Sequence, residues 1–348
     1  MIPVAFVRQH LSFSIKYRSV LLAGVSCLFA FIVASARSSN PAPSPSIALG
    51  VYPGSKFPQD IDRYVKLVGV KPAVVMWFQN WKEPLYYPEQ RKGIAASDTT
   101  AMITWSYDNP VTLQGINRGD YDTYIQESAK LAKEWTRPLY VRLMHEMNGG
   151  WQSFGPGVQG NTPSDFIQAW RHIVNLFRSN GADNVRWVWC PNIVGFGRSI
   201  APFDPLYPGD DYVDWVGLDG YNFGGPTAPW RSAEELFKPS YEDLERLTDK
   251  PVMICEWGCG EDGGDKAAWI RETFLKTIPQ LMPRVRVVIA FNQKAEADCR
   301  INSSPAALSA YREIAVSPMY KSEGPEERNA PTPATHRSPF EPRLPAAK

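Results

Sequence analysis

Eight short apolar segments, separated by longer stretches, constrain the fold of this chain more than any other feature. Segments 47–52, 139–145 and 285–291 are rich in Val, Ile and Leu, as strands buried on both faces are. The other five are 73–78, 101–105, 185–189, 213–218 and 252–256. Eight buried strands alternating with helices over about 270 residues favour an α/β fold, a single-domain (β/α)8 TIM barrel, over an open doubly wound sheet.

Capping signals predict where several of the intervening helices begin. The sequence Thr-Pro-Ser-Asp at 162–165 offers an N-cap, a proline at the first helical position and an acid in the first turn. Gly181 is expected to end that helix. Ser240 predicts the start of a second helix, Ser304 before a proline predicts the last one, and a long helix is expected after Gly264.

The N-terminal segment is predicted to direct the protein out of the cytoplasm. Residues 20–36 are uncharged and mostly apolar, follow three basic residues and end in Ala-Ser-Ala, which is typical of a signal peptide. An uncleaved membrane tether is the alternative. In both cases the basic flank stays inside and the body lies outside, so we expect a secreted or periplasmic protein, or a membrane-anchored one with its folded domain outside.

Composition sets the expected domain boundaries. Residues 1–36 form the signal peptide or N-terminal anchor, and 37–45 form a linker rich in Pro and Ser. The barrel domain is predicted over 46–316, and 317–348 are expected to be a disordered, Pro-rich tail.

The charge balance argues against a nucleic-acid partner. The whole chain has a formal net charge of +1, and beyond the basic N-terminal segment the acidic residues slightly outnumber the basic ones. A nucleic-acid binder needs a basic surface that displaces counterions from phosphates.

Two of the predicted strands end in glutamates. In a (β/α)8 barrel the chemistry lies at the C-terminal ends of the strands, where the chain places Glu146 and Glu256. Hydrolysis of a glycosidic bond needs two carboxyl groups, one to protonate the leaving oxygen and one to attack or to activate water. A separation of about 5–5.5 Å would indicate retention of anomeric configuration. For one isolated glutamate, a loop cap or an arginine partner is the alternative explanation.

Residues near other strand ends are candidates for binding a sugar. Tyr221 is expected to hydrogen-bond the attacking carboxylate, and Asn192 and Asn292 to bind hydroxyl groups. His145 is a further candidate, with a core histidine as its alternative. Tryptophans are expected to stack on sugar rings, with core packing as their alternative: Trp77, Trp81, Trp105 and Trp151.

Several stretches together resemble glycoside hydrolase family 26, a family of retaining endo-acting β-glycanases on the (β/α)8 barrel. They are RLMHEMNGGW at 142–151, VWCPN at 188–192, YPGDDYVDWVGLDGYN at 207–222, KPVMICEWG at 250–258 and FNQKAEADCRINSSPAALSAYR at 291–312. The resemblance implies Glu146 as acid/base and Glu256 as nucleophile. It also implies His145, Trp151 and Tyr221 as companions where the sugar is distorted.

One residue departs from the family pattern. The resemblance leads us to expect an aromatic platform, commonly Trp, immediately before Phe291, where this chain has Ala290. The departure bears on the substrate more than on the reaction, because the two carboxyl groups do not depend on it.

The resulting hypothesis is a monomeric, exported, retaining endo-β-glycosidase that acts on a polysaccharide. The family's prevalent substrate makes it a mannan endo-1,4-β-mannosidase first, with mixed-linkage β-1,3-1,4-glucan and β-1,3-xylan as alternatives. No metal or organic cofactor is expected, because two carboxyl groups suffice. A non-catalytic carbohydrate-binding envelope protein is the competing class.

The cysteines leave one question open. Cys259 and Cys299 follow neighbouring strands, and a disulfide between them requires Cα atoms within about 7 Å. Cys190 and Cys255 are expected to be buried free thiols.

Overall fold

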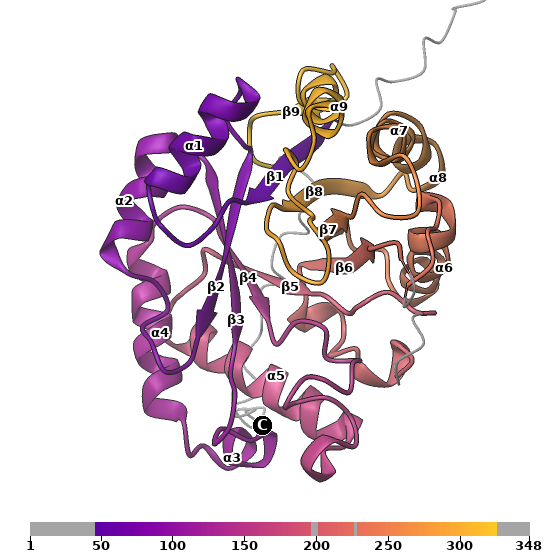
Figure 1. Cartoon of the computed structure of the whole chain (residues 1–348). Coiled ribbons are helices and arrows are strands. Elements are labelled where there is room, and N and C mark those ends of the chain that lie inside the picture. Colours follow the sequence, from indigo (N-terminus) through magenta and orange to yellow (C-terminus); the bar gives the residue numbers. More distant parts are fainter. Residues whose placement is uncertain (1–45, 196–200, 226–227, 326–348) are drawn as a thin grey trace, which may run out of the picture. The chain divides into compact units, whose positions relative to one another are not determined.

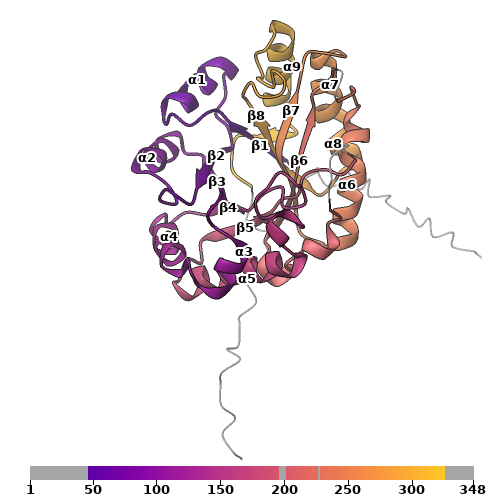
Figure 2. The ribbon, with the colours of Figure 1, turned by 60° about the horizontal axis from the view of Figure 1, so that its bottom comes forward.

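Eight parallel strands close into a barrel in the computed structural model, which describes residues 46–195, 201–225 and 228–325 (Figures 1 and 2). Strands β2 to β8 pair in sequence order, and β1 pairs with both β8 and β2. The strands are β1 (Ile47–Tyr52), β2 (Val74–Asn80), β3 (Thr100–Ser106), β4 (Leu139–Leu143), β5 (Val185–Trp189), β6 (Trp215–Asn222), β7 (Val252–Cys259) and β8 (Val285–Phe291). The predicted TIM barrel is confirmed.

Helices surround the strands, as Figure 2 shows. The α-helices are α1 (Gln59–Val68), α2 (Pro88–Ser97), α3 (Leu113–Arg118), α4 (Asp122–Glu134), α5 (Pro163–Ser179), α6 (Ala233–Leu247), α7 (Lys266–Glu272), α8 (Ile278–Leu281) and α9 (Pro305–Ala315). Short turns of other helix types are η1 (Val158–Gly160), η2 (Asp204–Leu206), η3 (Asp210–Tyr212) and η4 (Thr273–Thr277). The long helix expected after Gly264 is the run from α7 through the π-helical η4 to α8.

The alternation of side chains along each strand produces two apolar cores. One core fills the barrel interior with residues such as Met76, Tyr140 and Met253. The larger core lies between the strands and the helices and includes Trp77, Trp105 and many residues of the helices. Which core a residue joins is set by its position in the alternation, and this decides which side chains can reach the rim of the barrel.

Capping explains where three helices begin. Thr162 and Asp165 form a reciprocal capping box at α5, and Ser304 caps α9, as predicted. The prediction for α6 is wrong, because that helix begins at Ala233 and Ser232 is its N-cap. Ser240 lies inside the helix, fully buried, and its Oγ accepts a hydrogen bond from the backbone N–H of Val194 at 2.8 Å.

The folded domain extends further than the predicted boundary at residue 316. A short strand, β9 (Tyr320–Lys321), pairs with the start of β1. The buried Tyr320 hydroxyl also donates to the carbonyl of Phe274 at 2.8 Å. These contacts tie the segment after α9 to the barrel, so the disordered tail does not begin at residue 317.

The predicted N-terminal segment 1–36, the linker 37–45 and the end of the tail from residue 326 lie outside the described residues. Within the described ranges, the structure contains no helix that is both long and apolar enough to cross a membrane.

The described cysteines are all buried free thiols. This agrees with the expectation for Cys190 and Cys255. The disulfide considered for Cys259 and Cys299 is not formed: Cys259 is the last residue of β7, Cys299 lies in the segment after β8, and both are buried free thiols.

The capping box at α6 gives a test of its observed start. Ser232 Oγ accepts from the N–H of Glu235 at 3.2 Å, and Glu235 Oε2 accepts from the N–H of Ser232 at 2.8 Å. Ser232→Ala is expected to lower the free energy of unfolding by about 1 kcal/mol in urea denaturation. Ser179→Ala, at an exposed residue inside the last turn of α5, is the control and should change it by less than about 0.5 kcal/mol. Equal effects of the two changes would contradict this helix start.

Candidate active site

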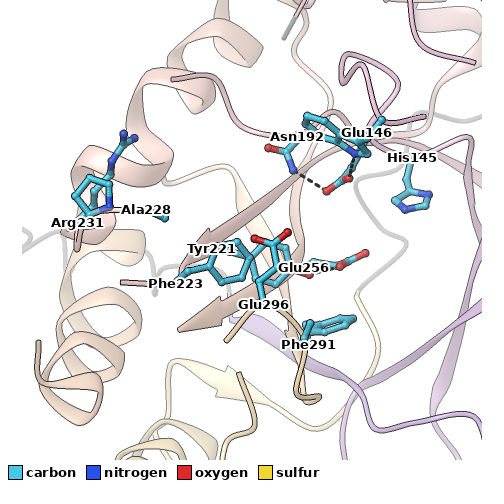
Figure 3. Close-up of a pocket in the computed structure, with 13 residues that line it drawn as sticks. His145, Glu146, Asn192, Tyr221, Phe223, Ala228, Arg231, Glu256, Phe291 and Glu296 are labelled. Atoms are coloured by element: carbon cyan, nitrogen blue, oxygen red, sulfur yellow. Dashed lines mark hydrogen bonds between the residues drawn. The ribbon is translucent and has the colours of Figure 1, made fainter. Parts of the chain in front are cut away.

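A pocket of about 640 Å³ opens at the C-terminal ends of the strands. Figure 3 shows Glu146 on one side with His145 and Asn192, and Glu256 on the other side with Tyr221. The pocket is lined by His145, Glu146, Trp151, Asn192, Tyr221, Phe223, Ala228, Pro229, Arg231, Glu256, Phe291, Ala295 and Glu296. The fold therefore brings together two glutamates that are more than a hundred residues apart in sequence.

Glu146 lies in a tight turn after β4 and is held by neutral donors. Its backbone has a positive φ of 53°, and its N–H donates to the carbonyl of Cys190 at 2.8 Å. The Nε1 of Trp151 donates to Oε2 at 2.7 Å, and the Nδ2 of Asn192 donates to Oε1 at 2.6 Å. Burial, followed by the nearby negative charge of Glu256, raises the pKa of Glu146 above its ordinary value. This carboxyl group is thus suited to carry a proton.

Glu256 reaches the pocket because β7 contains an extra residue. Leu218 of β6 pairs with Ile254, but the next residue of β6, Asp219, pairs with Glu256. Cys255 is the extra residue, and its side chain belongs to the barrel interior. A bulge of this kind redirects the side chains that follow it, so Glu256 also faces inward and lines the pocket.

The donors to Glu256 differ from those of Glu146. Arg142 Nη2 donates to Oε1 of Glu256, and the Tyr221 hydroxyl donates to Oε2. Burial, and then the Glu256 carboxylate, raise the pKa of Tyr221, which therefore keeps its proton and remains a donor. One glutamate is thus paired with a guanidinium, and the other is not.

Arg142 is a fully buried charge with two carboxylate partners. Its Nη1 donates to both oxygens of Asp219, at 2.6 and 2.7 Å, and its Nε donates to the Thr104 hydroxyl at 2.8 Å. Burial opposes its charge, but Asp219 and Glu256 outweigh burial and raise the pKa of Arg142. Burial raises the pKa of Asp219, and Arg142 opposes that rise.

His145 is a neutral residue of the pocket wall. Burial and then the positive charge of Arg142 lower its pKa well below the ordinary value. Its ring packs against Phe78 with centroids 5.7 Å apart. Its Nδ1 is buried and has no hydrogen-bond partner among the described residues, and the residue lines the pocket.

Aromatic side chains cover two sides of the pocket. Trp151 is 38% exposed at one side. At another side Tyr221 stacks on Phe223, with ring centroids 5.0 Å apart, and Tyr221 meets Phe291 edge to face. Exposed or half-exposed rings of this kind suit the apolar faces of sugars.

The expectation about position 290 is corrected by the strand geometry. Ala290 is 1% exposed and belongs to the core outside the barrel. The next residue, Phe291, faces the pocket. The aromatic side chain that β8 supplies is therefore Phe291, one residue after the expected position.

Four of the sequence candidates do not line the pocket. Trp77 and Trp105 are fully buried, because the alternation turns them towards the helices, where they pack on Trp135 and Phe177 respectively. Trp81 packs on Trp105. Asn292 is outside the pocket lining, and its Oδ1 accepts from the N–H of Ile301 at 2.9 Å, which stabilises the turn after β8.

The sequence did not point to several other residues, some that support the site from inside the barrel and some that line the pocket. Arg142 and Asp219 carried a usable signal, because each is a charged residue within an apolar strand, and buried charges are rarely unpaired. Phe223, Arg231, Ala295 and Glu296 line the pocket from the segments after β6 and β8. Periodicity does not determine the path of such segments, so it gave no signal for these residues.

Two thiols and a carboxylate lie together beneath the pocket. The Sγ atoms of Cys190 and Cys255 and an oxygen of Asp219 are all within 4.8 Å of one another. This carboxylate already accepts from Arg142 and from Cys190 Sγ at 3.2 Å. The guanidinium of Arg142 already balances the negative charge of Asp219. The two thiols and this carboxylate are therefore not assigned as a metal site.

Comparison with known proteins agrees with this geometry. The sequence profile of glycosyl hydrolase family 26 matches residues 55–241. Endoglucanase H of Acetivibrio thermocellus is 37% identical over 262 residues, which are 73% of this chain and 28% of that protein. The β-1,3-xylanase TXYA of a Vibrio species is 33% identical over 150 residues, 41% of this chain and 28% of that protein. This chain thus spans little more than a quarter of the length of either relative.

A solved structure shows the same fold. The catalytic domain of the family 26 endo-β-1,4-mannanase from Bacillus sp. JAMB-750 superimposes with a TM-score of 0.62 at 17% identity. The match covers 79% of this chain and 87% of that domain. A barrel with two glutamates at its rim is the architecture of a glycoside hydrolase. The chain belongs to glycosyl hydrolase family 26, because the family profile covers more than half of it.

The buried cation gives a prediction about stability. Arg142→Met leaves Asp219 buried without its countercharge and is expected to lower the free energy of unfolding by about 3–5 kcal/mol at neutral pH. The pKa of Asp219 then rises further in the folded state, while the unfolded value stays near about 4. The unfolded-state value is the same in both proteins, so the deficit should be small below the folded-state pKa of Asp219 in the wild type, which burial already raises, and should grow as the pH rises through it. Denaturant unfolding across a pH series measures it.

Arg271→Met provides the matched control. Arg271 makes a two-bond ion pair with Glu313 at 2.6 and 2.7 Å, but both side chains are exposed. Its loss should cost less than about 1 kcal/mol. A deficit in Arg142→Met that does not change with pH would contradict the role given to the Asp219 pair.

Proposed function

We propose that this chain is a retaining, endo-acting β-glycosidase that hydrolyses a β-linked polysaccharide. The observation that carries the proposal is the pair of rim glutamates with unlike partners in one pocket. Glu256 accepts from a guanidinium and a phenol, whereas Glu146 accepts from neutral donors and has a raised pKa. Two carboxyl groups in different environments are what acid-assisted displacement at a sugar carbon requires.

In the first step of the proposed reaction, Glu256 attacks the anomeric carbon while Glu146 donates its proton to the leaving glycosidic oxygen. The bond from the anomeric carbon to that oxygen breaks, and a glycosyl ester forms on Glu256. In the second step Glu146, now a carboxylate, removes a proton from water, and the resulting hydroxide oxygen displaces Glu256. The first step leaves Glu146 as the carboxylate that the second step needs. The second step returns a proton to Glu146 and so prepares it for the next substrate.

Arg142 and Tyr221 have supporting roles in this mechanism. Their hydrogen bonds hold the Glu256 carboxylate in one orientation, which is the positioning that a near-attack geometry requires. The Asp219 pair in turn fixes Arg142. His145, a neutral residue of the pocket lining, is proposed to contact the sugar together with Asn192.

We favour β-glucan as the substrate to be tested first. Endoglucanase H, which shares 37% identity over 73% of this chain, is named for action on glucan. The β-1,4-mannan expected from the family's prevalence and the β-1,3-xylan of the Vibrio relative are the alternatives. The structural match to a mannanase bears only on the fold, because its identity is low.

We further propose that the enzyme acts outside the cytoplasm as a monomer. The basic and apolar N-terminal segment supports export. Mass measurement of the N-terminus of protein recovered from the producing cell distinguishes a cleaved signal from a retained anchor. Light scattering measures the oligomeric state.

The catalytic assignment is tested by variants assayed on a panel of β-glucan, mannan and β-1,3-xylan. Glu146→Ala is expected to lower kcat/KM for reducing-end release by about 10²- to 10⁴-fold, and Glu256→Ala should lower it further. Glu313→Ala, on the exposed face of α9, is the control and should match the wild type. Activity that survives both pocket changes would overturn the assignment. Wild-type binding to a glycan without release of reducing ends would favour the non-catalytic class.

The stereochemistry gives a separate test. A glycosyl-enzyme intermediate requires the first product to keep the β configuration of the cleaved bond. Proton NMR of a fresh digest, recorded before mutarotation, is expected to show the β anomer first. An initial α anomer would contradict Glu256 as nucleophile and would leave hydrolysis itself intact.

A further inference from the structure

Asn148 connects the turn that carries Glu146 to the end of β5. Its side chain is 1% exposed. Its Nδ2 donates to the carbonyl of Asn192 at 2.8 Å, and its Oδ1 accepts from the N–H of Asn192 at 2.8 Å. A single carboxamide therefore binds both main-chain polar groups of Asn192, which fixes that residue on both sides.

Asn192 is itself a partner of Glu146. Its side-chain Nδ2 donates to Glu146 Oε1 at 2.6 Å. A link therefore runs from the Asn148 side chain, through the Asn192 backbone and side chain, to one oxygen of Glu146. The other oxygen is held separately by Trp151.

The backbone around Glu146 needs such support. Both Met144 and Glu146 have positive φ angles, 43° and 53°, which are uncommon for residues other than glycine. Conformations of this kind persist where surrounding contacts determine them. The hydrogen bond from the Glu146 N–H to the Cys190 carbonyl is one tie between this turn and the end of β5, and the Asn148 pair is the second.

We propose that Asn148 is a positioning residue for the proton donor, acting on Glu146 through Asn192. The inference depends on the proposed function of Glu146. Without Asn148, the Asn192 main chain loses both of its fixed partners, and its carboxamide no longer points reliably at Glu146. The proton then sits on a carboxyl group that is held by Trp151 alone.

The electrostatic consequence has a definite sign. The hydrogen bond from Asn192 lowers the pKa of Glu146, so weakening that bond raises the pKa. The titratable and charged groups that act on Glu146 are Arg142 of β4, Asp219 and Tyr221 of β6, and Glu256 of β7; a change at Asn148 leaves all four in place. Since the general acid must be protonated, the alkaline limb of kcat/KM should move to higher pH.

The experiment compares Asn148→Ala, Asn192→Ala and the double variant with the wild type. Asn148→Ala is expected to lower kcat/KM by about ten- to a hundredfold, as misplacement of a catalytic group does, and to move the alkaline limb upward. In the Asn192→Ala background the same change should have little further effect, because the link is already broken. An undiminished effect of Asn148→Ala in that background would overturn the proposal.

Asn161→Ala is the matched control. Asn161 is also a buried asparagine after β4, and its Nδ2 donates to the carbonyls of Ser153 and Gly155 at 2.9 and 3.3 Å. It should lower thermal stability without moving the pH limb. Asn148→Ser, which retains a smaller polar side chain, is used if Asn148→Ala does not fold. Identical pH profiles for the wild type and the Asn148 variant would show that Asn148 serves stability only.

A readout without substrate separates this inference from the proposed function. Carbon-13 NMR of protein labelled at the Glu side-chain carboxyl carbon follows the titration of Glu146, whose signal is identified by its loss in Glu146→Gln. Asn148→Ala is expected to shift that titration to higher pH, and an unchanged titration would overturn the positioning role. If the wild type hydrolysed none of the glycans in the panel, the proposed function would be overturned instead.

Discussion

The buried guanidinium of Arg142 is the interaction on which the arrangement of the site depends. It lies inside the barrel, fully excluded from water, and bridges Asp219 and Glu256. Desolvating three charged groups is costly, and their mutual attraction offsets this cost only when the hydrogen-bond geometry is good. Here Nη1, Nη2 and Nε all have oxygen partners. The same contacts that make this burial tolerable also fix the orientation of Glu256.

The two glutamates differ because different elements surround them. Glu256 emerges from a strand between β6 and β8 and faces the Arg142 cation. Glu146 lies one turn beyond its strand and faces only the indole of Trp151 and the carboxamide of Asn192 as donors. Burial, and then the negative charge of Glu256, raise the pKa of Glu146, which has no hydrogen bond from the cation. The division of roles therefore follows from the barrel topology together with one buried charge.

The sequence allowed the barrel and its two central acids to be predicted because both depend on strong local patterns. β1, β5 and β8 have the expected bounds, and Glu146 and Glu256 lie at the rim. The tryptophans were harder to place, because a strand buried on both faces has no polar alternation to show which side faces outward. Trp77 and Trp105 were therefore candidates for sugar stacking beside Trp151, although Trp151 alone of the three follows its strand in a loop. Ser240 also suggested a helix start, but the capping box at Ser232 determines it.

The extra residue in β7 has a consequence for how such proteins diverge. Cys255 is unpaired relative to β6, and its presence allows Glu256 to face the barrel axis. If β7 paired regularly at its present length, Cys255 would lie opposite Asp219, and every residue after it would change face. The Glu256 carboxylate would then point into the helix layer. Loss of Cys255 itself would close the irregularity and leave Glu256 opposite Asp219. A slip of pairing by one residue, and not a change in strand length, is therefore what would separate a barrel with this rim carboxylate from a folded barrel without it.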